Sequence, residues 1–272
     1  MSVSAKETDD HIKKSIKTAI KDNAYEKLIE DIFTSISECQ KHPLLDVIES
    51  ELQSLMANIT RIAMAKKSEN EQLAIYIKSL VTQTSAEMNE RICYYFHYKK
   101  FDNMIPFLEN IVFDLCFDTI RDLFFKKEQN RDIRYELQCT KLKPFVLRDI
   151  LKLQPPKYPE EDLDIVFAKS IEIIGLLDKV HTLQQAREVV LKVHQTIMND
   201  LAKYNNGELR RDFVTDDFID ALIYLLIKSD VVHVYGMISF MEGFMTPNDD
   251  CSQFGFSMRN LQIDARTVVN KL

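Results

Sequence analysis

The sequence is 272 residues long, and 46% of its residues are hydrophobic while 28% are charged. It contains only 5 glycines and 7 prolines, residues that the turns between strands require, so we predict an all-α fold rather than an all-β or α/β one. Its 35 basic and 42 acidic side chains give a net charge of −7. This charge argues against a nucleic-acid-binding protein and against docking on anionic lipid through charge alone.

Four helices are predicted in the first hundred residues. The first is weakly amphipathic, because isoleucines recur every four residues in a lysine-rich segment. The third opens with a proline and the fourth with a capping-box pattern, both of which favour a helix start. These helices are expected over residues 6–22, from Tyr25 to Cys39, from Pro43 through Leu55, and from Ser68 to Tyr95. Together they predict an antiparallel N-terminal helical bundle over residues 1–101.

The helical period returns in the second half of the chain. A helix is expected from Phe107 to Leu123, ending in an exposed run at residues 124–127, and a proline-rich irregular segment follows over residues 141–162. The later helices are expected from Pro159 to Leu177, from Thr182 to Leu201, and over residues 216–228, 233–245 and 257–271. The helix over residues 216–228 carries a long apolar run, which predicts that it is buried at the centre of its domain.

No segment of the sequence approaches the ~18 consecutive apolar residues of a membrane-spanning helix, and the first residues show no signal-peptide pattern. The cysteines are odd in number and widely scattered, which indicates reduced thiols in a cytoplasmic protein. They are Cys39, Cys93, Cys116, Cys139 and Cys251.

The motifs that metal-dependent or nucleotide-hydrolysing enzymes need do not occur in the sequence. The histidines form no His-Glu-x-x-His or Glu-x-x-His pair, and the glycines form no phosphate-binding loop. Cys39 and His42 are interpreted as a buried thiol beside a surface imidazole. The aromatic and basic run over residues 94–101 is interpreted as core rather than as a base-stacking surface. We therefore expect no cofactor, no metal, and no covalent or hydrolytic chemistry.

Three carboxylates, Asp216, Asp217 and Asp220, lie at the start of the predicted central helix. The helix dipole explains the first two, which each stabilise the helix by ~0.3–1 kcal/mol behind a Thr215 cap. Asp220 lies a full turn further on and needs another explanation. The DDxxD pattern of all-α isoprenoid synthases is one, but those enzymes need a second acidic cluster. The nearest cluster, residues 160–164, serves as a helix start, so prenyl-diphosphate chemistry ranks third among the alternatives.

The sequence from residue 102 to residue 270, most strongly from residue 163 onward, resembles the VPS-nine domain. This domain is the catalytic module of guanine nucleotide exchange factors for early-endosomal Rab GTPases. The resemblance implies such a domain over residues 102–272, beside the bundle over residues 1–101. It rests on Asp216-Asp217-Phe218-Ile219, on Leu222-Ile223-Tyr224 with Lys228, and on Gly255-Phe256-Ser257-Met258-Arg259-Asn260-Leu261.

The resemblance implies that Asp216 is an aspartate finger, with Asp217 assisting its position. The finger's carboxylate would take the P-loop lysine of the GTPase and oppose its magnesium ion, so that GDP leaves. A hydrophobic groove between this helix and the last one would receive aromatic switch residues of the GTPase. The residues expected to contact the partner are Phe218, Ile219, Asp220, Tyr224, Phe256, Arg259, Asn260 and Leu261.

Three positions depart from the family pattern: Asp220 stands for a proline, Phe256 for a tyrosine and Arg259 for a threonine. Phe256 keeps a ring but loses a hydroxyl, and Arg259 is able to pair with an acid near the finger. Two functions stay open. One is GDP–GTP exchange on an early-endosomal Rab in membrane trafficking. The other is a catalytically degenerate module that binds a small GTPase or another trafficking partner. Either implies a cytoplasmic protein recruited peripherally to endosomal membranes.

Overall fold

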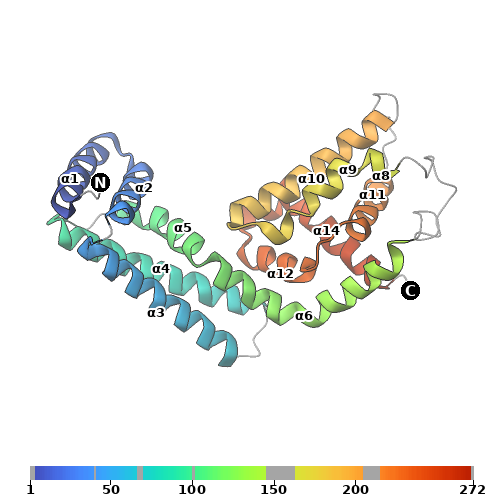
Figure 1. The fold of residues 1–272 in the computed structure, drawn as a ribbon, viewed down its shortest axis with the longest axis horizontal. Coiled ribbons are helices and arrows are strands. Elements are labelled where there is room, and N and C mark those ends of the chain that lie inside the picture. The colour runs from blue at the N-terminus through green and yellow to red at the C-terminus, as the bar shows by residue number, and fades with distance from the viewer. Residues whose placement is uncertain are drawn as a thin grey trace. The chain divides into compact units, whose positions relative to one another are not determined.

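The computed structural model describes residues 4–39, 41–65, 70–99, 102–144, 163–204 and 215–270. Every regular element in these ranges is helical, which confirms the all-α prediction (Figure 1). The chain divides into two compact units, Met1–Ile120 and Arg121–Leu272, and the boundary falls inside one long helix, α6 (Phe117–Leu142). No helix in the described ranges is both long enough and apolar enough to cross a lipid bilayer.

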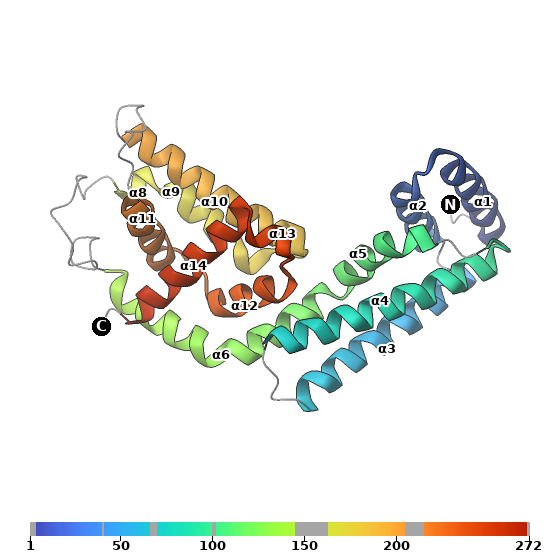
Figure 2. The same cartoon turned by 180° about the vertical axis from the view of Figure 1, so that it is seen from behind.

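The N-terminal unit is built from helices that pack in pairs. They are α1 (Ala5–Asp22), α2 (Tyr25–Glu38), α3 (Pro43–Ala65), α4 (Asn70–Tyr95), the 3₁₀-helix η1 (Asp102–Met104) and α5 (Ile105–Leu115). α1 packs against α2, and α4 lies between α3 and α5, with contacts to both (Figures 1 and 2). The inward faces of these helices carry isoleucine, leucine and methionine side chains that are almost completely buried, and these side chains form the core of the unit.

Local capping signals determine where the helices of this unit begin. Ser4 accepts the N–H of Glu7 while the Glu7 carboxylate accepts the N–H of Ser4, a reciprocal pair that starts α1. Pro43 is the first residue of α3, as predicted. The capping box predicted at Ser68 lies outside the described residues, and α4 is described from Asn70 onward.

The imidazole of His42, predicted to lie on the surface, is only 1% exposed, so that prediction is wrong. Its Nδ1 accepts the N–H of Leu44 at 3.2 Å, which leaves Nε2 as the protonated nitrogen, 3.0 Å from Asp9 Oδ1. The hydroxyl of Tyr95 donates to the other oxygen of Asp9 at 3.3 Å. Because both ring nitrogens have partners, the His42 ring is buried at little cost. These bonds join α1, the α2–α3 turn and the end of α4.

The C-terminal unit surrounds one apolar helix. Besides most of α6, it contains α8 (Leu163–Val166), α9 (Ala168–Ile174), the 3₁₀-helix η3 (Leu177–Lys179), α10 (Leu183–Tyr204), α11 (Thr215–Lys228), α12 (Val234–Phe244), α13 (Pro247–Asp250) and α14 (Gln253–Asn270). α14 packs against α10, α11 and α12 (Figure 2). Residues 221–227 of α11 are all buried, which confirms that this helix lies at the centre of its unit.

The prediction that a helix ends in an exposed run at residues 124–127 is wrong. The helix breaks earlier, at Cys116, and then continues as α6 to its end at Leu142. The reason is tertiary: Phe124 is fully buried, and its ring centre lies 5.7 Å from that of Phe240 and 5.9 Å from that of Phe244 on α12. Packing of these rings therefore extends α6 through a segment whose neighbouring lysines indicated a helix end.

The single helix predicted to reach Leu177 is divided in the structure into α8, α9 and η3. Its predicted start at Pro159 lies outside the described residues. Phe167 is 2% exposed at the first break, and the second break is at Gly175. The start of α10 is as predicted, since Thr182 accepts the N–H of Gln185 at 3.0 Å.

Two carboxylates from other elements hold the beginning of α12. Asp132 of α6 accepts the N–H groups of Tyr235 at 2.7 Å and of Gly236 at 3.2 Å. Asp178 of η3 accepts those of residues 232 and 233 at 2.7 and 3.3 Å. The first N–H groups of a helix have no partner within the helix itself, so these acids satisfy α12 from outside and fix its position.

Asp132 is also predicted to make the stability of the protein depend on pH. Its side chain is only 2% exposed, and this burial raises its pKa to about 7, although the two backbone hydrogen bonds lower it. The folded protein therefore keeps a proton on Asp132 at pH values where the unfolded chain has released one, above its ordinary pKa of ~3.9. The stabilisation is complete below that value and is lost as the pH rises through about 7.

Between about pH 5 and about pH 8, the free energy of unfolding should fall by about 2 kcal/mol more for the natural chain than for an Asp132→Asn chain. Urea titrations of both chains at both pH values measure this difference, and the titrating groups distant from Asp132 cancel in the comparison. Asp122→Asn, at a side chain 66% exposed on the same helix, is the control and should leave the pH dependence unchanged. Equal pH dependence of the natural and Asp132→Asn chains would contradict the assignment.

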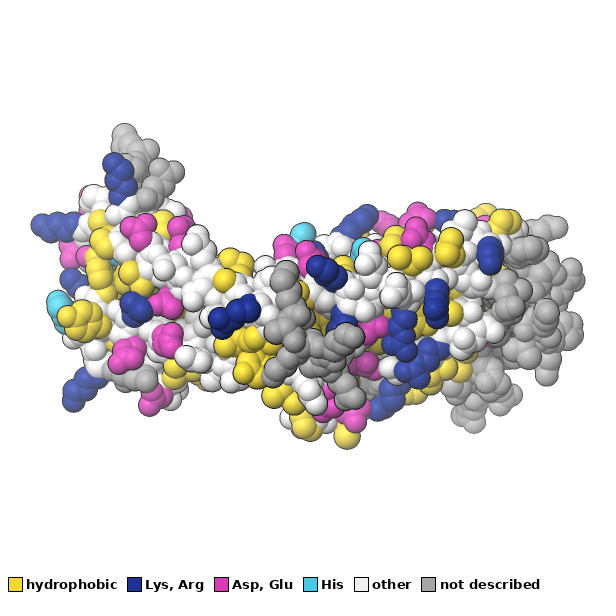
Figure 3. All heavy atoms as spheres, turned by 90° about the horizontal axis from the view of Figure 1, so that it is seen from below, with side chains coloured by type: hydrophobic (Ala, Val, Ile, Leu, Met, Phe, Trp, Pro, Cys, Tyr) yellow, Lys and Arg dark blue, Asp and Glu magenta, His cyan; other side chains and the backbone are white. Residues whose placement is uncertain are grey.

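Charged and apolar side chains are mixed on one face of the described surface. Figure 3 shows Lys and Arg side chains interleaved with acidic and hydrophobic ones on the face that it presents. Among the exposed large apolar side chains, Tyr94 has 82% of its surface accessible and Ile165 has 76%. A single exposed apolar side chain is ordinary on a protein surface.

Candidate functional site

The predicted finger lies in the first turn of α11, which begins at Thr215. The backbone of Asp216 and Asp217 is helical there, while their carboxylates lie outside the described part of the structure. A carboxylate in the first turn of a helix is stabilised by the helix dipole, which favours the ionised form that a finger needs. The roles of Asp216 and Asp217 stay predictions.

Three aromatic rings join α10, α11 and α14, and the one on α11, Phe218, follows the predicted finger by two residues, about half a turn. Phe218 of α11 is 5% exposed, and its ring centre lies 4.6 Å from that of His194 on α10. The His194 ring centre lies 5.8 Å from that of Phe256 on α14, whose side chain is 43% exposed. We call these three rings the aromatic cluster. It brings together two predicted contact residues that are far apart in the sequence.

His194 is not among the residues predicted from the sequence. Its position in the sequence could have indicated it: His194 lies in the apolar stripe of α10, between Val190 and Ile197, so its ring faces the core. Burial lowers the pKa of His194, and its Nδ1 atom is buried without a hydrogen-bond partner in the described structure. A neutral ring fits this position, because it packs between the two phenylalanines without the cost of a buried charge.

The space beneath the aromatic cluster is too small for a ligand. The cavity between α10, α11 and α14 has a volume of about 10 Å³, which holds at most one water molecule. Phe218, Leu222 and Leu261 are among its lining residues. This region therefore offers an apolar surface to a macromolecule rather than a pocket to a small molecule.

The other predicted contact residues divide between the surface and the interior. Ile219 and Asp220 are half-buried on α11, and Arg259 is exposed on α14. Asn260 and Leu261 are 7% and 3% exposed, so they support the surface from beneath.

Tyr224 of α11, also predicted to contact the partner, is 3% exposed and lies in the interior. Its hydroxyl donates to Asp164 of α8. Burial, followed by this hydrogen bond, raises the pKa of Tyr224 above its ordinary value. The Lys228 ammonium lies 5.4 Å from the centre of the Tyr224 ring and 3.9 Å from Asp164. Tyr224 thus holds α8 against α11.

Arg259 has a partner other than the acids near the finger. Its guanidinium lies 2.7 Å from Asp250 Oδ1 and donates to the Asp250 carbonyl at 3.1 Å. Both side chains are more than half exposed, so this pair contributes little to stability. It does fix the guanidinium of Arg259 at the start of α14, one turn from Phe256.

Arg187 of α10 holds the corner between α12 and α14, which is the connection that contains α13. Its guanidinium lies 2.8 Å from Asp249 Oδ2 and donates to the Phe244 carbonyl at 3.4 Å. It also stacks 5.4 Å from the centre of the Phe254 ring. Asp249 in turn caps α13 together with Thr246. These contacts set the position from which Phe256 and Arg259 project.

The described residues contain no cluster of three or more His, Cys, Asp or Glu side chains that could hold a metal ion. All five cysteines are free thiols, and of these only Cys251 is exposed.

Comparison with known protein families matches residues 167–268 to the vacuolar sorting protein 9 (VPS9) domain, which is the VPS-nine family of the sequence resemblance. This range includes α9 to α13, most of α14 and all the predicted site residues. No curated protein matches the chain. A domain that extends back to residue 102, beside a separate bundle over residues 1–101, stays a prediction.

Proposed function

The chain carries a VPS9 domain over residues 167–268, and from this premise we propose that it is an exchange factor for an early-endosomal Rab GTPase. A VPS9 domain implies guanine nucleotide exchange on a Rab-type small GTPase in general. The proposal adds the early-endosomal class of the GTPase, a role in endosomal membrane trafficking and a peripheral location on endosomal membranes. The observation that supports exchange is the position of Asp216 in the first turn of α11, two residues before Phe218 of the aromatic cluster, and the early-endosomal class rests on the sequence resemblance.

The proposed chemistry is a competition between charges. A GTPase holds GDP through a magnesium ion and a P-loop lysine, which neutralise its phosphates. The Asp216 carboxylate would pair with that lysine and oppose the magnesium ion, so the phosphates would lose their counter-charges and GDP would leave. No bond to the nucleotide is made or broken by the exchange factor in this scheme.

The proposed docking surface is apolar and lies on α11 and α14. Phe256 exposes its ring, and Ile219 is half-buried on the neighbouring α11. An apolar surface of this kind suits aromatic switch residues of a GTPase, because burial of large rings contributes most of the energy at the centre of an interface. Phe218 and His194 support Phe256 from below, so the surface is fixed before the partner arrives.

One observation favours the second function, binding without exchange. Arg259 stands where the family has a threonine, and its pair with Asp250 holds a cation at the edge of the proposed surface. A bulky, ion-paired guanidinium there would take the space that the family's small hydroxyl leaves for the partner. A module of this kind would bind the GTPase and leave its nucleotide in place.

Release of a fluorescent GDP analogue from a panel of purified Rab GTPases tests the proposal. We expect the full chain at micromolar concentration to accelerate release about a hundredfold from early-endosomal Rabs, and much less from the others. Pull-down of the same GTPases, loaded with GDP or freed of nucleotide, separates the two functions. Binding without acceleration would establish the degenerate module, and neither binding nor acceleration would refute both.

A further inference from the structure

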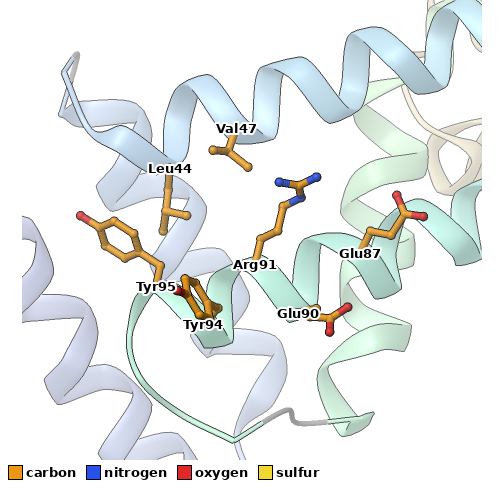
Figure 4. A pocket seen from close by; sticks show the side chains of 7 residues that line it. All are labelled: Leu44, Val47, Glu87, Glu90, Arg91, Tyr94 and Tyr95. Carbon is orange, nitrogen blue, oxygen red and sulfur yellow. The ribbon is translucent and has the colours of Figure 1, made fainter.

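A cavity of about 430 Å³ opens between the start of α3 and the end of α4 in the N-terminal unit (Figure 4). Its size falls within the range of ligand-binding pockets, which runs from roughly 300 to 1,000 Å³. Leu44 and Val47 project into it from α3, and five side chains between Glu87 and Tyr95 line it from α4. We call it the acidic groove.

The base of the acidic groove is apolar and held in place. Leu44 is 3% exposed, and Val47 and Tyr95 are half-buried beside it. The hydroxyl of Tyr95 donates to Asp9, whose other oxygen lies 3.0 Å from His42 Nε2. Because these bonds hold the Tyr95 ring, the base is already formed and needs little reorganisation to receive an aliphatic side chain.

The charges in the acidic groove do not balance. Its one cation, Arg91, extends toward α3 and lies 2.6 Å from Glu51, so that pair is neutral (Figure 4). Glu87 is exposed, accepts the uncharged amide of Gln83 at 2.9 Å, and has no ion pair with another described residue. Glu90 is exposed and has no ion-pair partner among the described residues. Two negative charges are therefore left on one wall, three residues apart on α4 and close in space.

Tyr94 completes this wall. It follows Glu90 by four residues, one turn of α4, and it is 82% exposed. A large aromatic ring left in solvent beside two carboxylates suits a cation, because the ring face attracts ammonium and guanidinium groups.

We propose that the acidic groove binds a helical segment of a partner protein that carries an aliphatic side chain and, one turn away, a lysine or arginine. The aliphatic side chain fills the space over Leu44, Val47 and Tyr95. The cation lies between Glu87, Glu90 and the ring of Tyr94. Charge decides the class of occupant, because two unbalanced carboxylates repel phosphates and anionic lipid headgroups. The site is distinct from the VPS9 domain, so its test does not depend on nucleotide exchange.

The test uses a short alanine-based helical peptide with a leucine, a lysine one turn away and a terminal tryptophan. The full chain contains no tryptophan, so the emission of the peptide reports binding directly. We expect the lysine peptide to bind at least about tenfold more tightly than a matched peptide with glutamate in that position, and its affinity to fall as salt is added.

Replacing both carboxylates, in a Glu87→Gln, Glu90→Gln chain, should lower the affinity for the lysine peptide about tenfold. Tyr94→Ala should lower it about fivefold. All three side chains are exposed, so the variants should fold as the natural chain does. The control chain carries Glu30→Gln and Glu136→Gln, at two exposed glutamates elsewhere. It has the same change in net charge, and its affinity for the lysine peptide should be unchanged.

Equal binding of the lysine and glutamate peptides, no binding of either, or an unchanged affinity in the Glu87→Gln, Glu90→Gln chain would overturn the proposal. Sedimentation of the natural and Tyr94→Ala chains tests whether a second copy of this chain occupies the groove instead. A dimer that Tyr94→Ala converts to a monomer would assign the groove to a second copy of this chain instead.

Discussion

The Asp216→Ala chain is expected to accelerate GDP release about a hundredfold less than the natural chain does, on the Rab that responds best. The reason is electrostatic: the substitution removes the one charge that is proposed to take the P-loop lysine of the GTPase from the phosphates. Folding should be preserved, because a carboxylate in the first turn of α11 stabilises the helix by ~1 kcal/mol or less. Stopped-flow release of the GDP analogue and urea unfolding measure the two effects.

Asp217→Ala is the matched control for the finger. It removes the same charge from the same turn of α11, so general electrostatic attraction to the GTPase falls equally in both variants. We expect its loss of activity to be less than tenfold, in keeping with a residue that assists the position of the finger. Equal losses in the two variants would show that net charge matters and that no single finger exists. Clear unfolding of the Asp216→Ala chain would give that residue a structural role.

Gly255→Ala is expected to lower the free energy of unfolding by about 3 kcal/mol, the largest stability effect among the substitutions considered. A Cβ atom at this position would lie 2.5 Å from the Asp249 carbonyl oxygen, 2.7 Å from that of Asp250 and 2.9 Å from the Asp250 carbonyl carbon. All three are backbone atoms, so α13 as a whole would have to move away from α14. Phe256 and Arg259 would move with that corner, so exchange activity should fall as well.

Gly175→Ala is the matched control for this substitution. The nearest atoms to its Cβ position are carbonyl oxygens at 3.3 and 3.4 Å, so the new methyl group needs only small shifts. We expect a change of ~1 kcal/mol or less. Thermal or urea unfolding of the three chains compares them directly. A Gly255→Ala chain as stable as the Gly175→Ala chain would mean that α13 is free to move, and that the corner does not fix Phe256.

Much of the fold was predictable because its causes are local. A scarcity of glycine and proline, and apolar residues at helical spacing, predict an all-α chain whatever its tertiary arrangement. Pro43 and Thr182 mark helix starts through bonds or ring geometry within one turn. The apolar run over residues 221–227 predicts burial on all sides, which the structure confirms. The motifs over residues 216–228 and 255–261 that carry the VPS-nine resemblance lie inside the range that matches the VPS9 domain, while residues 102–166 of the resemblance lie outside it.

Other features were not predictable, because they depend on contacts between residues that are distant in the sequence. His42 is buried because Asp9, 33 residues away, satisfies its ring. α6 continues past Phe124 because that ring packs on α12. His194 joins the predicted site only because Phe218 and Phe256 meet on either side of it.

The sequence by itself thus determined the fold class, several helix starts and the domain family that matches residues 167–268, since each follows from residues within a few turns or a matching segment. The tertiary structure decided which polar groups are buried, where two helices end and which side chains share a surface. Those outcomes depend on whether a distant group supplies the hydrogen bond or the apolar contact that burial requires, and spacing along the chain does not specify such a group.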